Sequence, residues 1–177
     1  MNEQLWQECI DFHGHECIGL AIGFRAALYA KEEFCANERS EDEELVCVTE
    51  NDACGVDAIQ LITGCTFGKG NLIYRPTGKN AFSFFNRENG KKIRIIMKHG
   101  RMDGEDREAA QNFILDAPFE ELFTTSEPAF ALPERARIFV SRVCEECGES
   151  APEHKMRFQQ GKIVCLDCFK AYNRGWE

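Results

Sequence analysis

The stretch A-F-S-F-F-N-R-E-N-G-K-K-I-R-I-I-M-K, residues 81–98, predicts two neighbouring strands joined by a tight turn. The apolar segments 81–87 and 91–98 flank E-N-G-K, and Asn-Gly between two strand-like runs is a strong hairpin signal. Upstream, L-V-C-V-T-E (45–50) alternates as a strand does, and N-L-I-Y-R (71–75) is a further strand-like run. These four segments predict a β-sheet.

Helical patterns surround these strands. The first expected helix is short, and Leu5, Cys9, Ile10 and Phe12 share one of its faces. A longer helix is expected at about 17–34. Of two further helices, one ends at Gly64, and the other is capped by Asp103 and stops before Pro118. The buried candidates of the longer helix are Leu20, Phe24, Ala27, Leu28 and Tyr29. Because helices and strands do not alternate regularly, we predict an α+β or mixed α/β core.

Two connecting segments divide the chain. The run N-E-R-S-E-D-E-E (37–44) is expected to form an acidic, solvated connection. Residues 124–133 are expected to be a linker, and A-R-I-F-V-S-R (136–142) a strand that leads into a small C-terminal unit. We therefore predict a core domain at 1–130 and a linker strand with a four-cysteine finger at 131–177.

Charge and composition limit the classes of function. No apolar run reaches membrane-spanning length, and the acidic N-terminus lacks the basic flank of a signal peptide. We therefore expect a cytoplasmic protein that does not associate with membranes. The formal net charge of −9, without a local basic patch, argues against nucleic acid as a partner.

Two C-x-x-C pairs close the chain: Cys144 with Cys147, and Cys165 with Cys168. Zinc prefers four soft ligands in a tetrahedron, and two such pairs supply them from opposite sides. Between the pairs, residues 156–164 suggest a hairpin, and residues 169–174 suggest a short helix. The pattern predicts a structural zinc in a treble-clef or ribbon-type finger, with an iron–sulfur centre or redox dithiols as the minor alternatives, and with His154 as a surface residue.

A second group of cysteines lies in the core region. H-G-H-E-C-I-G places Cys17, and N-D-A-C-G-V-D places Cys54, at the expected start of a helix, where a thiol pKa is lowered. His13 and His15 could supply imidazole ligands or move protons. The alternative is that these thiols only pack a helix junction and that the histidines only hydrogen-bond a turn.

The glycine-rich loop after the third helix is a further candidate. It contains Cys65 and Lys69 within G-C-T-F-G-K-G-N (64–71). A Walker loop has four residues between its glycines, Ser or Thr after the lysine and a strand before it, and this loop has none of these features. We therefore reject nucleoside triphosphate binding by this loop.

Three ordered motifs point to a known family. F-H-G-H-E-C-I-G-L-A-I-G-F-R-A, C-G-V-D-A-I-Q-L-I-T-G-C-T-F-G-K-G-N-L and T-G-K-N-A-F together resemble the FmdE family, which is named for formylmethanofuran dehydrogenase. The resemblance implies an α+β core with a mixed, loosely thioredoxin-like sheet flanked by helices, and a homodimer. It also implies a pocket of cysteine and histidine; the residues that match are His13, His15, Cys17, Cys54 and Cys65, with Asp57, Gln60 and Lys69 beside them.

The resemblance does not carry the dehydrogenase reaction with it. That chemistry belongs to a molybdenum or tungsten pterin with iron–sulfur clusters, for which this chain has no room. We therefore expect an accessory protein with a metal- or ligand-binding core pocket, which could associate with a molybdenum or tungsten enzyme or another protein.

Any reaction in the core would be thiol- or metal-dependent chemistry on a small molecule. The candidates for it are Cys17, Cys54, His15 and Lys69 as reactive groups, Asp57, Gln60 and Cys65 as pocket residues, and His13, His15, Cys17 and Cys54 as ligands of a second metal. The alternative function is a noncatalytic adaptor or regulator whose finger binds a protein partner or nucleic acid.

Overall fold

The computed structural model describes residues 2–34, 39–100 and 106–175. The chain divides into two compact units, Met1–Ala136 and Arg137–Glu177. The sequence placed this division at residues 130 and 131. Among the described residues, no helix is both long enough and apolar enough to cross a membrane.

The first unit contains a five-stranded mixed sheet in the order β2-β1-β3-β4-β5. Its strands are β1 (Leu45–Thr49), β2 (Leu72–Tyr74), β3 (Ala81–Asn86), β4 (Lys92–Met97) and β5 (Phe123–Ser126). β1 and β2 are parallel, and the other pairs are antiparallel. The predicted hairpin is β3–β4, in which Phe85 pairs with Lys92 and Gly90 adopts a positive φ of 72° in the turn. The prediction of a mixed sheet is confirmed.

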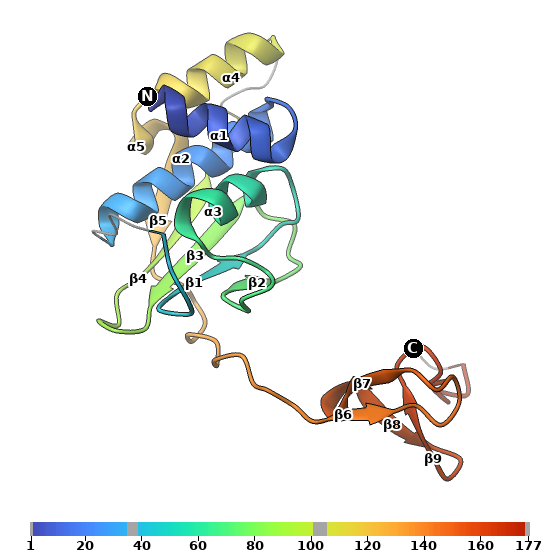
Figure 1. Cartoon of the computed structure of the whole chain (residues 1–177). Coiled ribbons are helices and arrows are strands. Elements are labelled where there is room, and N and C mark those ends of the chain that lie inside the picture. Colours follow the sequence, from blue (N-terminus) through green and yellow to red (C-terminus); the bar gives the residue numbers. More distant parts are fainter. Residues whose placement is uncertain (1, 35–38, 101–105, 176–177) are drawn as a thin grey trace. The chain divides into compact units, whose positions relative to one another are not determined.

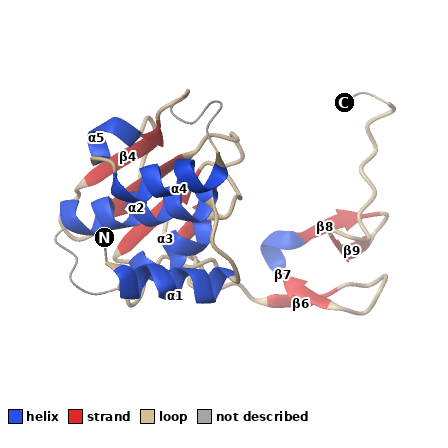
Figure 2. Cartoon of the chain, turned by 90° about the horizontal axis from the view of Figure 1, so that it is seen from above, coloured by secondary structure: helices blue, strands red, loops and turns tan. Residues whose placement is uncertain are grey.

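Helices cover one face of this sheet (Figures 1 and 2). They are α1 (Glu3–His13), α2 (Ile18–Glu33), α3 (Gly55–Thr63), α4 (Arg107–Asp116) and the short α5 (Phe119–Leu122). The core lies between the helices and the sheet; its largest side chains include Phe24 and Ile59 from the helices and Phe82, Phe84 and Ile95 from the strands, all with exposures of 2% or less. Burial of this apolar surface is the main force that holds the two layers together.

Glycines allow α2 and α3 to cross in close backbone contact. A Cβ atom on Gly23 would lie 2.0 Å from the carbonyl oxygen of Gly55, and a Cβ atom on Gly55 would lie 2.8 Å from the carbonyl oxygen of Gly19. Real Cβ atoms do not approach other atoms so closely, so only glycine fits at both positions. The contact brings the N-termini of the two helices together, and with them Cys17 and Cys54.

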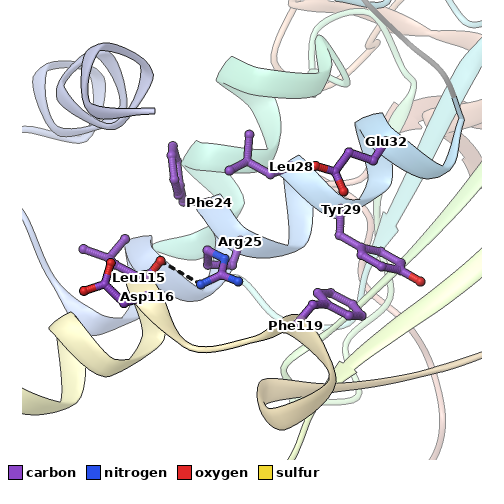
Figure 3. A pocket seen from close by; sticks show the side chains of 8 residues that line it. All are labelled: Phe24, Arg25, Leu28, Tyr29, Glu32, Leu115, Asp116 and Phe119. Atoms are coloured by element: carbon purple, nitrogen blue, oxygen red, sulfur yellow. Dashed lines mark hydrogen bonds between the residues drawn. The ribbon is translucent and has the colours of Figure 1, made fainter. Parts of the chain in front are cut away.

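Arg25 of α2 holds the C-terminal end of α4. Its guanidinium donates hydrogen bonds to the carbonyl oxygens of Ile114 (2.6 Å), Leu115 (2.7 Å) and Ala117 (2.7 Å), which the helix itself leaves without partners. Figure 3 shows this side chain among the residues that line a cavity between α2 and the C-terminal end of α4. The volume of the cavity is about 280 Å³. On the wall of the same cavity, the ring of Tyr29 stacks on Phe119 with centroids 3.5 Å apart.

Part of the predicted linker at 124–133 belongs to the sheet or packs on it. Residues 123–126 form the edge strand β5, and Phe130 packs on the second face of the sheet against Val46, Val48 and Phe85. The Arg75 guanidinium lies 4.8 Å from the centre of the Phe130 ring. The linker prediction is therefore wrong for these residues, since one aromatic side chain covers the face that the helices leave open.

The predicted acidic connection at 37–44 is also not fully solvated, as Glu43 shows. Residues 37 and 38 lie outside the described part of the chain, but Glu43 is only 7% exposed. Its carboxylate pairs with Arg87 (3.4 Å) and accepts a hydrogen bond from the backbone of Ala136 (3.0 Å). The prediction of a solvated connection is wrong for Glu43, because partners far along the chain supply the charge and the donor that make its burial possible.

Two other element boundaries differ from the predictions. Asp103 lies outside the described residues, and the side chain of Asp106 caps α4 by accepting from Glu108 N–H. Residues 136–140 form no strand, and β6 comprises only Ser141–Val143. The apolar pattern of 136–142 favoured a strand, yet Ile138 is fully exposed and has no sheet to cover it.

The second unit is built from two short hairpins. β6 pairs with β7 (Ser150–Pro152), and β8 (Met156–Gln159) pairs with β9 (Lys162–Cys165), with a single 3₁₀ turn at Glu153–Lys155. The predicted hairpin at 156–164 is confirmed, whereas the predicted helix at 169–174 is absent from the described residues. The core of this unit is small; its buried members are Cys144, Met156, Val164 and Cys165.

Candidate metal centres

Four cysteines converge in the second unit. The sulfur atoms of Cys144, Cys147, Cys165 and Cys168 all lie within 4.8 Å of one another, and those of Cys147 and Cys165 are 3.9 Å apart. In a tetrahedron with Zn–S bonds of about 2.3 Å, neighbouring sulfur atoms are roughly 3.8 Å apart. The observed spacing therefore fits a structural zinc.

The backbone around Cys144 supports a thiolate ligand at this position. The backbone N–H of Cys165 donates to the Cys144 sulfur (3.3 Å), and the N–H groups of Cys147 and Cys165 lower the pKa of Cys144 to about 6. His154 is exposed, and its ring lies against Phe139 with centroids 4.1 Å apart. The finger thus has a complete four-sulfur set, with His154 outside it, as predicted.

We expect Cys165→Ser to remove one zinc equivalent per chain and to unfold the second unit. The reason is that four buried residues give this unit too little core without its metal. Elemental analysis and circular dichroism of the full chain test this expectation. His154→Ala is the control, and it should keep its zinc; loss of zinc in this control would show that the ligand set is misassigned.

In the first unit, three predicted residues form a relay. The Oδ2 atom of Asp57 lies 2.7 Å from Nδ1 of His13, and Nε2 of His13 lies 3.9 Å from the sulfur of Cys17. The second oxygen of Asp57 accepts a hydrogen bond from Gln60 (3.3 Å). With the carboxylate accepting from Nδ1–H, the nitrogen that faces Cys17 is the one with a free lone pair.

His15 completes a potential ligand set. The ring nitrogens of His13 and His15 and the sulfur of Cys17 lie within 4.8 Å of one another, and the two rings are 4.5 Å apart between centroids. His13 is at the last position of α1, and Gly14, with a φ of 92°, ends that helix and turns the chain back toward His15. This sharp turn is why H-x-H can direct both imidazoles to one point.

Cys17 and Cys54 begin two adjacent helices, as the sequence predicted. The Cys17 sulfur caps α2 by accepting from Leu20 N–H at 3.3 Å. The two sulfur atoms lie 3.9 Å (Cys17) and 3.7 Å (Cys54) from the place where a Gly19 Cβ would be. Burial and the Cys17 side chain raise the pKa of Cys54, which is opposite to the effect expected of a helix N-terminus.

The structure separates two predicted residues from this cluster. Cys65 is fully buried in the hydrophobic core, donates to the Leu45 carbonyl (3.4 Å), and has its pKa raised to about 11 by burial. Lys69 donates to the Ser40 carbonyl (2.7 Å) and ties down the glycine loop. Both follow the C-terminal end of α3, whereas Asp57 and Cys54 lie at its beginning. The nine-residue helix between them is roughly 13 Å long, which keeps the loop away from the cluster.

The described residues therefore define a particular class of protein: an α+β domain with a Cys/His cluster at a helix junction, followed by a four-cysteine finger. Residues 12–124 match the family model described as FmdE, molybdenum formylmethanofuran dehydrogenase operon. Residues 137–174 match the prokaryotic dksA/traR C4-type zinc finger. The chain belongs to the FmdE family, which confirms the resemblance found in the sequence.

Two individual proteins are similar to this chain. One, from Archaeoglobus fulgidus, is described as a probable S-adenosyl-L-methionine-binding protein and is 31% identical over 196 residues, covering 92% of this chain and 51% of its own length. The chain thus spans about half of that relative. The other is the crystal structure of a tungsten formylmethanofuran dehydrogenase FmdE-like protein from Syntrophus aciditrophicus. It aligns with a TM-score of 0.64 at 24% identity over 94% of this chain and 90% of its own, which supports the fold.

Proposed function

We propose that the core cluster is a metal site that presents a bound ion to a small molecule, in a protein that acts as an accessory to other enzymes. The observation that carries the proposal is the Asp57–His13–Cys17 relay. A carboxylate that fixes one nitrogen of a histidine and turns the other toward the ligand centre is a common arrangement around protein-bound metals. A merely structural histidine in a turn does not require that orientation.

The donor set favours a soft or borderline ion. One thiolate and two imidazoles suit zinc or a neighbouring transition metal, and neighbouring donor atoms in such a tetrahedral site are about 3.5 Å apart. Three protein ligands leave a fourth position for an exogenous ligand, as in catalytic rather than structural sites. A bound ion would supply Lewis acidity or a soft binding point at that position.

The surrounding residues prepare the ligands. Asp57 holds His13 in one tautomer, and Gln60 in turn holds Asp57. The Cys17 sulfur lies at the N-terminus of α2 and accepts a hydrogen bond from the N–H of Leu20, a position that suits a negatively charged metal ligand. The sulfur atoms of Cys17 and Cys54 both lie within 3.9 Å of the position that a Gly19 Cβ would occupy, so Cys54 is a candidate to replace a ligand. The dehydrogenase reaction itself is not part of the proposal, because it needs a pterin metal centre.

The finger supports a second candidate function as a docking module. Phe158 is 76% exposed, and Val143 (62%) and Tyr172 (86%) are also uncovered in this small unit. Exposed aromatic and aliphatic side chains suit a protein partner better than nucleic acid. A molybdenum or tungsten enzyme, or a second copy of the chain, would be such a partner.

We expect the full chain to be a homodimer in solution, as the family resemblance implies. Light scattering at micromolar concentration should give about twice the 20.2 kDa chain mass. A monomer mass that persists at higher protein concentration would contradict this expectation.

We expect Asp57→Asn to weaken metal binding in the core by about 10- to 100-fold, since the amide no longer fixes the His13 tautomer as a carboxylate does. Competition with a chromogenic chelator, performed on the full chain, measures the affinity, and the finger zinc serves as an internal standard. Asp52→Asn, in the exposed loop before the same helix, is the matched control and should bind as the unchanged protein does. Equal affinities of the two variants would refute the orienting role of Asp57.

A further inference from the structure

A cavity lies directly beside the proposed metal ligands. Its volume is about 480 Å³, within the range of small-molecule sites. His15, Glu16 and Cys17 line it from the turn between α1 and α2. The other wall comes from the first turns of α4, with Arg107 and Glu108 among its residues.

The cavity is lined by side chains of both charges, and three of its polar side chains have no partner within the described part of the protein. The carboxylate of Glu16 is held by Gln111 of α4 (3.2 Å), so the two walls are joined by one hydrogen bond. Among the described residues, the side chains of Arg107, Glu108 and Asn112 have no hydrogen-bond or ion-pair partner. One free guanidinium, one free carboxylate and one free carboxamide thus face a space that ends at a thiol and an imidazole.

We propose that this cavity binds a small zwitterionic thiol, an amino acid with a sulfhydryl side chain or a close analogue. The inference rests on the proposed function, because the thiol of the ligand would occupy the position next to Cys17 and His15 that the three protein ligands leave open. The planar guanidinium of Arg107 matches a carboxylate with two parallel hydrogen bonds. Glu16 and Glu108 accept from the ammonium group, and Asn112 can serve either end.

The charge pattern favours a ligand that carries both signs over simpler ligand classes. A phosphate or a dicarboxylate would face two carboxylates, Glu16 and Glu108, against one guanidinium. A purely cationic thiol would leave Arg107 without a counterion beside a positively charged metal centre. A ligand with both a carboxylate and an ammonium group can pair with every charged side chain of the cavity. Its thiol, a soft donor, would then reach the wall formed by Cys17 and His15.

Three related probes test the ligand class on the full, metal-loaded chain: L-cysteine, cysteamine, which lacks the carboxylate, and 3-mercaptopropionate, which lacks the ammonium group. Isothermal titration calorimetry should show that L-cysteine binds about tenfold or more tightly than either analogue, the effect of losing one charge-assisted contact. Arg107→Gln should weaken L-cysteine binding by a similar factor and leave cysteamine binding unchanged. Arg142→Gln, in the second unit, is the control and should change neither affinity.

The metal content of the same samples separates the two proposals. Equal affinities of the three probes, or an Arg107→Gln variant that binds L-cysteine normally, would overturn the ligand class even if the core holds its metal. A core without metal would overturn the proposed function. If a core without metal still bound L-cysteine more tightly than the two analogues, and this binding depended on Arg107, the ligand class would be supported while the metal site would be refuted.

Discussion

Replacing Gly23 by alanine is expected to lower the free energy of unfolding of the first unit by about 3 kcal/mol and to abolish metal binding at the proposed core site. The added Cβ would lie 2.0 Å from the Gly55 carbonyl oxygen and 2.4 Å from its Cα atom. Both are backbone atoms, so the contact can be relieved only if α2 and α3 move apart. The proposed ligand Cys17 lies at the start of α2, and Asp57, which orients the second ligand His13, lies on α3. Separation of the two helices would therefore move Cys17 away from Asp57.

Urea denaturation followed by circular dichroism measures the stability, and elemental analysis measures the metal. Gly68→Ala is the matched control, because a Cβ atom at Gly68 would meet no atom within 4 Å and its φ is not in the left-handed region. The control should retain both stability and metal. A Gly23→Ala variant as stable as the Gly68→Ala variant would show that the helices do not depend on this contact.

Replacing Arg25 by methionine is expected to cost about 3 kcal/mol, roughly 1 kcal/mol for each of three carbonyl groups left without a donor. The affected carbonyls end α4 at Ile114, Leu115 and Ala117. Methionine keeps much of the side-chain volume, so the loss reports the hydrogen bonds more than the packing. The midpoint of chemical denaturation measures the effect.

Lys92→Met is the control for charge removal. Lys92 pairs with Glu127 at 2.9 Å, but both side chains are largely exposed, so the pair contributes little, about 0–1 kcal/mol. If the Arg25 and Lys92 variants lost the same stability, Arg25 would be acting as an ordinary surface charge and not as the cap of α4.

The strongly patterned elements could be predicted from the sequence. The Asn-Gly hairpin of β3 and β4, the long helix α2 and the helix that ends at Gly64 all have apolar periodicity and a clear stop signal. β5 could not be recognised, because F-T-T-S is an edge strand with three exposed residues and no alternation to reveal it. The prediction of a strand at 136–142 was wrong for most of its length, because the apolar residues at 136–140 have no partner strand to pair with.

The site was predictable in its residue types and partly in its geometry. The helix starts at Cys17 and Cys54 and the closeness of His13 and Asp57 agree with the motif that matches the family. Cys65 and Lys69 belong to the same motif but lie beyond the far end of α3, a distance that adjacency in sequence conceals. The cavity wall from α4 was not foreseen, because nothing local to Arg107 or Asn112 reveals that the fold brings them to Cys17.

The most direct test of the core metal site is the number of metal equivalents bound per full chain. We expect two equivalents in the unchanged protein, one in the core and one in the finger. We expect one equivalent in the double variant His13→Ala/Cys17→Ser, which loses the core site, and one in Cys144→Ser/Cys147→Ser, which loses the finger site. A single equivalent in the unchanged protein, retained in full by His13→Ala/Cys17→Ser, would contradict the core metal site.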